Sequence, residues 1–120
     1  MKYLKLSPEY QCSPLWVSSD GNFYENLSID TSPFNESLKN KISKWAMCFE
    51  KTLNQDYPPE SGFASFGDEE EFERDGIEIW ENITSHYLNE YIVIFYKSHM
   101  LAKLYTNITD YKNDLKNNNN

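Results

Sequence analysis

The feature that most constrains the fold is a long amphipathic segment at residues 68–87, DEEEFERDGIEIWENITSHY. At about 100° per residue, its apolar residues and one glycine share one side of a helix. They are Phe72, Gly76, Ile79, Trp80, Ile83 and Tyr87. The other side carries Glu70, Glu71, Arg74, Glu78 and Glu81, with Ile77 among them. The pattern predicts a helix with one face in the core and an acidic face in solvent.

Two local signals refine this helix. Asp68 with Glu71 three residues later resembles a capping box, which predicts that the helix starts there with Asp68 as its cap. A glycine inside a helix costs about 1 kcal/mol relative to alanine. Gly76 therefore predicts a close contact between the helix and the sheet.

A second helix is predicted after the loop at residues 30–33, from one apolar stripe over four turns. The stripe consists of Leu38, Ile42, Trp45, Phe49 and Leu53. Either Asn35 or Ser32 can cap its start. Its outer side carries Lys39, Lys44, Lys51 and Met47, so the two helices are expected side by side over one sheet, one basic and one acidic outside.

The strand signals are shorter. Residues 2–6 alternate in polarity, and residues 15–17 precede the turn dipeptide Asp20-Gly21, which predicts a hairpin. Residues 91–96 are β-branched or aromatic throughout, which predicts a central strand buried on both faces. Residues 97–99 are expected to turn, residues 100–116 fit either strand or helix, and the Asn-rich residues 117–120 are expected to fray.

The predicted fold class is α+β: a small, mostly antiparallel sheet with two main helices packed on one face. A chain of 120 residues suits one domain. Residues 1–105 are expected to form it, and residues 106–120 a C-terminal tail for which partial helix is one alternative. The long connection at residues 54–67 contains Pro58-Pro59, and Phe63 and Phe66 are expected to pin it to the core.

Charge is gathered in one segment. The net charge is −8, and ten acidic residues against Arg74 alone lie between Asp56 and Glu81. Such a field repels nucleic acid and anionic membranes and attracts basic proteins, although a merely solvated helix face has the same composition. Cys12 and Cys48, with no secretory or membrane-spanning segment, predict free thiols in a cytoplasmic protein.

Catalytic chemistry finds little support. The four glycines form no phosphate-binding loop, and no cofactor is indicated. His86 and His99 lack metal-ligand spacing, so no metal site is expected. A Cys48–His86 nucleophile is formally possible, but Cys48 flanks an apolar stripe, which predicts a half-buried, inert thiol.

A family resemblance adds to these residues. Its motifs are Ser-Pro-Leu-Trp (13–16), Asp-Gly-x-Phe-Tyr-Glu-Asn (20–26), x-Leu-x-x-x-Ile-x-x-Trp-Ala (37–46), Thr-Leu-Asn (52–54), Pro-Pro-Glu-Ser-Gly-Phe (58–63) and Phe-x-x-x-Gly-x-x-x-Trp (72–80). Residues 3–96 thereby resemble immunity proteins of contact-dependent growth inhibition and other polymorphic toxin systems. The resemblance implies a cytoplasmic antitoxin that blocks a C-terminal toxin domain, commonly a nuclease such as a tRNase, and some such toxins act together with elongation factor Tu.

We expect a monomer whose toxin-binding surface combines the acidic helix with the preceding loop and one tyrosine. Its residues are Glu70, Glu71, Ile77, Glu78, Glu81, Asp56, Glu60 and Tyr24. Nucleic acid and membrane are not expected as direct partners. Two other surfaces stay open, the outer face with Met47, Lys44 and Lys51, and the Phe23-Tyr24 hairpin. The alternative functions are a small acidic regulatory or adaptor module and, in third place, an enzyme.

Overall fold

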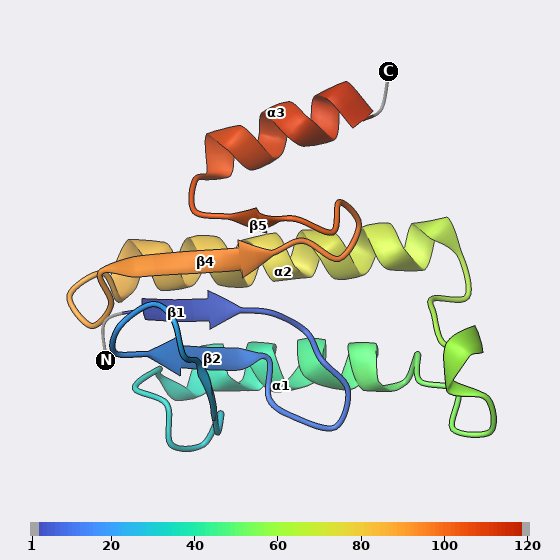
Figure 1. Cartoon of the computed structure of the whole chain (residues 1–120), viewed down its shortest axis with the longest axis horizontal. Helices are drawn as coiled ribbons and strands as arrows, with labels where there is room; N and C mark the ends of the chain where they lie inside the picture. Colours follow the sequence, from blue (N-terminus) through green and yellow to red (C-terminus); the bar gives the residue numbers. More distant parts are fainter. Residues whose placement is uncertain (1–2, 119–120) are drawn as a thin grey trace.

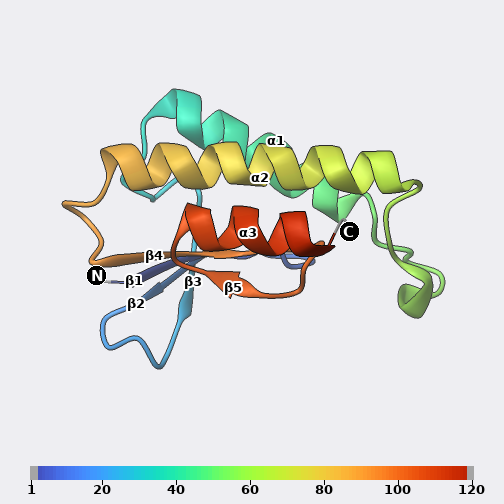
Figure 2. The same ribbon diagram turned by 90° about the horizontal axis from the view of Figure 1, so that it is seen from above.

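A computed structural model describes residues 3–118, in which one sheet is covered on one face by helices (Figures 1 and 2). The strands are β1 (Tyr3–Leu6), β2 (Leu15–Ser18), β3 (Glu25–Leu27), β4 (Val93–Lys97) and β5 (Leu104–Tyr105). The helices are α1 (Glu36–Glu50), α2 (Phe66–His86), α3 (Ile108–Asn118) and the 3-10 turn η1 (Pro58–Glu60). Residues 1–2 and 119–120 lie outside the described residues. They include Lys2 of the expected first strand and two residues of the expected frayed end.

The sheet has the strand order β3-β2-β1-β4-β5. The β1–β2, β2–β3 and β4–β5 pairs are antiparallel, whereas β1 and β4 pair in parallel. The α+β class and the mostly antiparallel sheet are therefore confirmed. The middle position belongs to β1 and not, as predicted, to the strand from residues 91–96.

The expectation that this strand is buried on both faces is also wrong. In β4, Ile94 and Tyr96 are buried under the helices, while Val93, Phe95 and Lys97 are only partly buried on the other face. Because all six residues at positions 91–96 are apolar or aromatic, the sequence shows no alternation of polar and apolar side chains there. It therefore could not identify which residues face the core. The face of the sheet away from the helices is thus left open (Figure 2).

Both main helices bury most of their predicted stripes, and one predicted cap is wrong. Leu53 and Tyr87, the last residue of each stripe, lie past the helix ends and are only half-buried. In α1, Leu38, Ile42, Trp45 and Phe49 are buried, and the Asn35 side chain caps the start by accepting the Leu38 N–H. The helix α2 begins at Phe66, three residues earlier than a helix capped by Asp68 would begin. Ser65 Oγ accepts the Asp68 N–H at 3.1 Å, so Ser65 is the cap and Asp68 lies inside the first turn.

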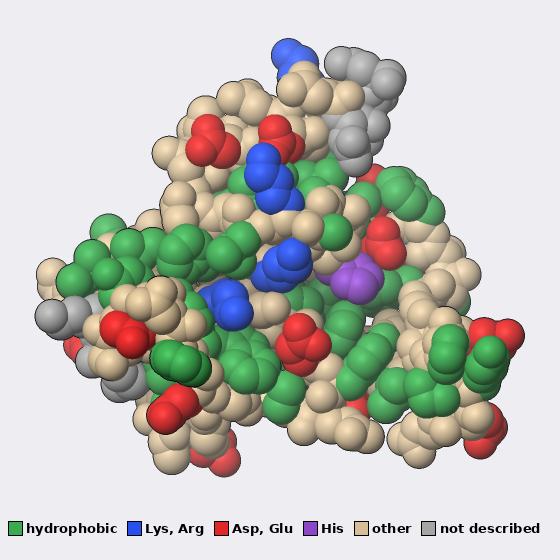
Figure 3. All heavy atoms as spheres, in the orientation of Figure 1, with side chains coloured by type: hydrophobic (Ala, Val, Ile, Leu, Met, Phe, Trp, Pro, Cys, Tyr) green, Lys and Arg blue, Asp and Glu red, His purple; other side chains and the backbone are tan. Residues whose placement is uncertain are grey.

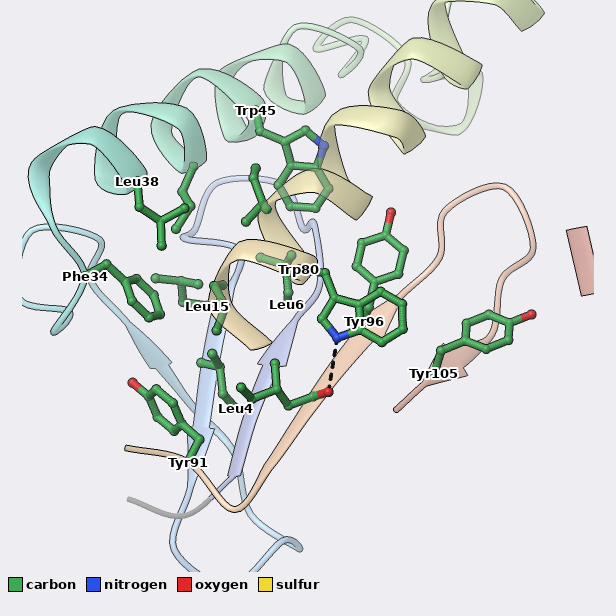
Figure 4. Close-up of a cluster of buried hydrophobic side chains, with 14 of the residues drawn as sticks. Leu4, Leu6, Leu15, Phe34, Leu38, Trp45, Trp80, Tyr91, Tyr96 and Tyr105 are labelled. Carbon is green, nitrogen blue, oxygen red and sulfur yellow. Dashed lines mark hydrogen bonds between the residues drawn. The ribbon is translucent and has the colours of Figure 1, made fainter. Parts of the chain in front are cut away.

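Tryptophans join the two helices to each other and to the sheet. The Trp45 ring stacks on Phe72 with centroids 4.7 Å apart, and its Nε1–H donates to the Phe72 carbonyl at 2.9 Å. Trp80 stacks on Tyr96 and donates from Nε1 to the Ile94 carbonyl at 3.3 Å (Figure 4). These bonds satisfy the polar edges of large rings inside an apolar core.

Gly76 lies where these groups converge. A Cβ at this position would lie 2.7 Å from both Trp45 Cζ2 and the Tyr96 hydroxyl oxygen. The predicted close contact between helix and sheet is therefore confirmed. Glycine permits α2 to approach both the indole of α1 and the ring of β4.

The segment after β4 contains both alternatives that the sequence left open, a short strand β5 and the helix α3. Tyr111 of α3 is buried edge-on against Tyr96 and Tyr105, with centroids 6.2 and 5.4 Å apart. The helix α3 lies along the β5 edge on the helical side of the sheet (Figures 1 and 2).

Of the two predicted loops, one is confirmed and the other only in part. The chain reverses at Asp20-Gly21 as predicted, and the Asp20 carboxylate accepts the N–H groups of Asn22 and Phe23. Phe63 packs against Phe72 at 5.1 Å and anchors the connection between α1 and α2. Phe66 does not pin it, because this residue opens α2 and stays 65 % exposed.

Candidate interaction surface

The outward side of α2 presents its acids in two stripes. Residues three or four apart in a helix are neighbours, so Glu70, Ile77 and Glu81 follow one stripe and Glu71 and Glu78 the other. All four glutamates are exposed, while Ile77 is half-buried. The first stripe lies toward α3, because Glu70 and Ile77 line a groove with residues of that helix. The second lies toward α1.

The stripe toward α1 lies beside positive charge. Asp75 and Glu78 of α2 line a groove of about 220 Å³ together with Lys41 and Lys44 of α1. Burial in this groove, followed by the negative charges of Glu71 and Glu78, raises the pKa of the Asp75 carboxyl. The expectation that an acidic and a basic helix lie side by side is confirmed. The stripe facing α3 carries Arg74 of its own helix.

One acid of α2 is not on the surface. Glu73 is 2 % exposed, accepts a hydrogen bond from the Ser98 hydroxyl, and accepts the His99 N–H at 3.2 Å. Sequence reasoning missed this role. The available signal was helical spacing, since Glu73 precedes Gly76 by three residues and Trp80 by seven and so shares their face. Glu73 binds the turn after β4 to α2.

The remaining predicted contact residues lie elsewhere. Asp56 and Glu60 are exposed in the connection that contains η1, at the end of the molecule where α2 begins (Figure 1). Tyr24 lies beside Lys5, a residue of the open sheet face. The fold therefore brings the α2 residues together, places the loop acids next to the start of α2, and separates Tyr24 from both by the sheet.

The open sheet face is aromatic and carries lysines. Tyr3, Lys5, Trp16 and Phe95 alternate with the buried residues of their strands, and Lys5, Trp16 and Phe95 lie in one cross-strand row. The Lys5 ammonium lies 5.9 Å from the Trp16 ring centre and 4.7 Å from that of Tyr24. Figure 3 looks onto this face and shows blue cationic side chains between green apolar ones.

Other candidate chemistries are limited. Cys48 is exposed, which corrects the prediction of a half-buried thiol. Among residues 3–118, no cluster of three or more His, Cys, Asp or Glu side chains is arranged to hold a metal ion. In the same part of the chain no helix has both the length and the apolar character needed to cross a bilayer. His99 packs against Phe49, Phe63 and Phe72, with Nε2 3.7 Å from a Glu69 carboxylate oxygen.

The structure thus defines a class of α+β protein with one helix-covered sheet face, an acidic outer helix and an open aromatic face. The chain belongs to the family described as Serratia CdiI immunity protein-like, whose model matches residues 2–98. The resemblance found over residues 3–96 is therefore confirmed, and β5 and α3 lie beyond the match. The chain matches no curated protein sequence.

Proposed function

We propose that this protein is a cytoplasmic immunity protein that binds the C-terminal toxin domain of a contact-dependent growth inhibition effector and blocks it. The toxin is a basic nuclease, such as a tRNase. The single observation that carries the proposal is the family match over residues 2–98. Elongation factor Tu, where it takes part, is reached only through the toxin, and the immunity protein acts as a monomer.

The binding surface that we propose is the outward side of α2 with Ile77 as its apolar anchor, flanked by Asp56 and Glu60. Support comes from the exposure of Glu70, Glu71, Glu78 and Glu81 on one helix. Nuclease clefts are basic because they hold phosphate, so a row of carboxylates can occupy the same site. Inhibition then follows from exclusion of the nucleic acid by shape and by charge.

The test uses the toxin domain encoded beside this chain, co-purified with it and assayed for cleavage of tRNA. We expect an equimolar complex in which cleavage is blocked. Changing Glu70, Glu71, Glu78 and Glu81 together to Gln should slow association at low salt by about tenfold or more and flatten its salt dependence.

A matched control removes the same amount of charge away from α2. Glu9, Glu25, Glu90 and Asp110 are exposed acids on other elements, and their amide variants combined should leave association with the toxin nearly unchanged. If both quadruple variants associated with the toxin equally slowly, the effect would come from the net charge of the protein and not from the surface of α2. No binding by the wild-type chain would refute the immunity function itself.

A further inference from the structure

Arg74 is the one cation in the acidic segment at residues 56–81. Its side chain is exposed on the outward side of α2. Glu70 precedes it by four residues and Glu78 follows it by four, so the three side chains are neighbours on the helix. Glu70 belongs to the stripe toward α3 and Glu78 to the stripe toward α1. Arg74 therefore lies at the middle of the surface that we propose for the toxin.

The guanidinium of Arg74 has no partner within the protein, although acids surround it. None of the ion pairs among residues 3–118 includes this residue. Glu70, Glu71 and Glu78 lie only three or four residues away along α2, and all three are exposed. The planar fork of N–H donors is thus available to a partner.

Burial of this cation in a complex requires a partner for it. A toxin that covers the outward side of α2 also covers Arg74, because this residue lies at the middle of that surface. Arginine is enriched in interfaces and is often among the few residues that dominate their binding energy. A guanidinium that is buried without a partner is strongly destabilising, and the surrounding glutamates are drawn to the basic residues of the toxin. The anion that pairs with Arg74 has to come from the toxin.

We infer that Arg74 pairs with a carboxylate of the toxin that lies among the basic residues of that protein. A guanidinium binds both oxygens of a carboxylate through two parallel N–H groups, so the pair fixes the position of α2 on the toxin. This inference rests on the proposed function and extends it, because it names one anionic group that the basic toxin carries. A toxin with Lys or Arg in that place is rejected by like charge, which makes Arg74 a determinant of specificity.

A merely solvated Arg74 would have a different role. It would only reduce the repulsion among the glutamates of α2, and its removal would make the surface more negative. Association with a basic toxin would then become faster and the complex at least as tight. The two roles therefore predict opposite changes in affinity for the same substitution.

The test measures association and dissociation rates of the toxin with Arg74→Gln and Arg74→Lys. Arg74→Gln should raise Kd by about tenfold or more through faster dissociation, while association stays as fast as in wild type or becomes faster. Arg74→Lys keeps the charge and loses the fork, so its Kd should lie in between. Lys112→Gln is the matched control, because it removes an exposed cation of α3 from the groove that Arg74 also lines. Its dissociation rate should equal that of wild type, and thermal unfolding of each variant identifies any loss that comes from folding.

A second measurement identifies the carboxylate on the toxin. Each Asp and Glu of the toxin is replaced in turn by Asn or Gln, and each replacement is measured with wild-type protein and with Arg74→Gln. For one replacement, Arg74→Gln should cause almost no further loss of affinity, because the pair is already broken.

Three outcomes would overturn the inference. Dissociation of Arg74→Gln as slow as that of wild type, with association still slowed in the quadruple glutamate variant, would leave the proposed function standing and assign Arg74 to solvent. A loss of affinity that no toxin replacement abolishes, or that Lys112→Gln matches, would show that Arg74 has no carboxylate partner on the toxin. Absence of toxin binding by the wild-type chain would end both proposals together.

Discussion

The outward side of α2 and the open face of the sheet are two surfaces of opposite character on one small domain. The first presents exposed carboxylates, and the second presents half-buried rings around Lys5, which lies 4.7 Å from the Tyr24 ring centre. They lie on opposite sides of the sheet (Figure 2), so one compact partner cannot cover both by docking flat. A basic partner is attracted to the first by its carboxylates.

The two sides of α2 also differ in how well they should tolerate substitution, because the outer side is exposed and the inner side is closely packed. On the outside of α2, Glu70 and Glu81 contact mainly solvent. On the inside, Gly76 leaves no room for a methyl group, and Glu73 is enclosed with its hydrogen-bond partners. Substitutions in α2 should therefore divide into those that affect stability and those that affect binding.

The largest effect is expected from Gly76→Leu. A side chain here would collide with Trp45 and Tyr96, and overpacking of this kind costs about 3 kcal/mol, which exceeds the gain of about 1 kcal/mol in helix propensity. Urea unfolding measures the loss. Gly67→Ala is the matched control, since its Cβ would meet only Ser65 Oγ at 3.7 Å. Similar midpoints for both variants would contradict the close packing of α2.

The next effect separates a buried acid from an exposed one. Glu73→Gln should destabilise the fold by about 1–2 kcal/mol, because Ser98 and the His99 N–H donate to different carboxylate oxygens. An amide offers only one oxygen, so one of these two donors would face the amide NH2 group. Glu70→Gln should change the free energy of unfolding by less than about 0.5 kcal/mol. Urea unfolding of the pair, at one pH and salt concentration, measures this difference. A Glu73→Gln variant as stable as Glu70→Gln would show that the buried carboxylate does not hold the turn after β4.

A binding comparison chooses between the two surfaces. Ile77→Ala should weaken toxin binding by about tenfold, whereas Tyr24→Ala should leave it within about twofold of wild type. Surface plasmon resonance with the toxin immobilised gives both values. The opposite ranking would move the interface to the open sheet face and would also explain why its aromatic rings have no cover.

The smallest effect concerns two acids whose pKa values move in opposite directions. The raised pKa of Asp75 means that its ionised form is destabilising, so Asp75→Asn should raise stability at neutral pH by a few tenths of a kcal/mol. This advantage disappears as the pH falls below the ordinary aspartate pKa, where the carboxyl is protonated in both folded and unfolded states.

Asp114 is the matched case of opposite sign. Hydrogen bonds from Lys103 and then Tyr105 lower the pKa of its carboxyl. Its ionised form therefore stabilises the fold above the ordinary aspartate pKa, and that contribution is lost as the pH falls through the lowered value. Asp114→Asn should be less stable than wild type at neutral pH and approach it in acid. Thermal unfolding between pH 3 and pH 7 gives both signs.

Helical periodicity identified much of the structure without help from other elements. The stripes of α1 and α2 were predictable because a helix repeats every 3.6 residues. Apolar residues at this spacing mark the buried side of each helix, from Leu38 to Phe49 in α1 and from Phe72 to Ile83 in α2. The same periodicity placed the four exposed glutamates together on α2. The same periodicity indicates the burial of Glu73, because this residue shares the helix face of Gly76 and Trp80.

The predictions that were wrong concern residues whose burial or hydrogen bonding depends on segments distant in the sequence. In the run of residues 91–96, apolar side chains occupy both faces, and only the helices on one side and the empty face on the other distinguish Tyr96 from Phe95. Ser65 and not Asp68 caps α2, which the spacing of Asp68 and Glu71 did not reveal. Cys48 borders the buried stripe of α1 but lines the surface groove between α1 and α2, where it stays exposed.

By itself, the sequence determined the α+β class, the two amphipathic helices and the concentration of negative charge on α2, because these follow from local period and composition. Only the tertiary structure decided the parallel pairing of β1 with β4, the burial of Glu73, and the groove that α3 builds beside Ile77. Each of these depends on which distant segments come into contact. That choice is made by the packing of the whole core, and no short stretch of residues encodes it.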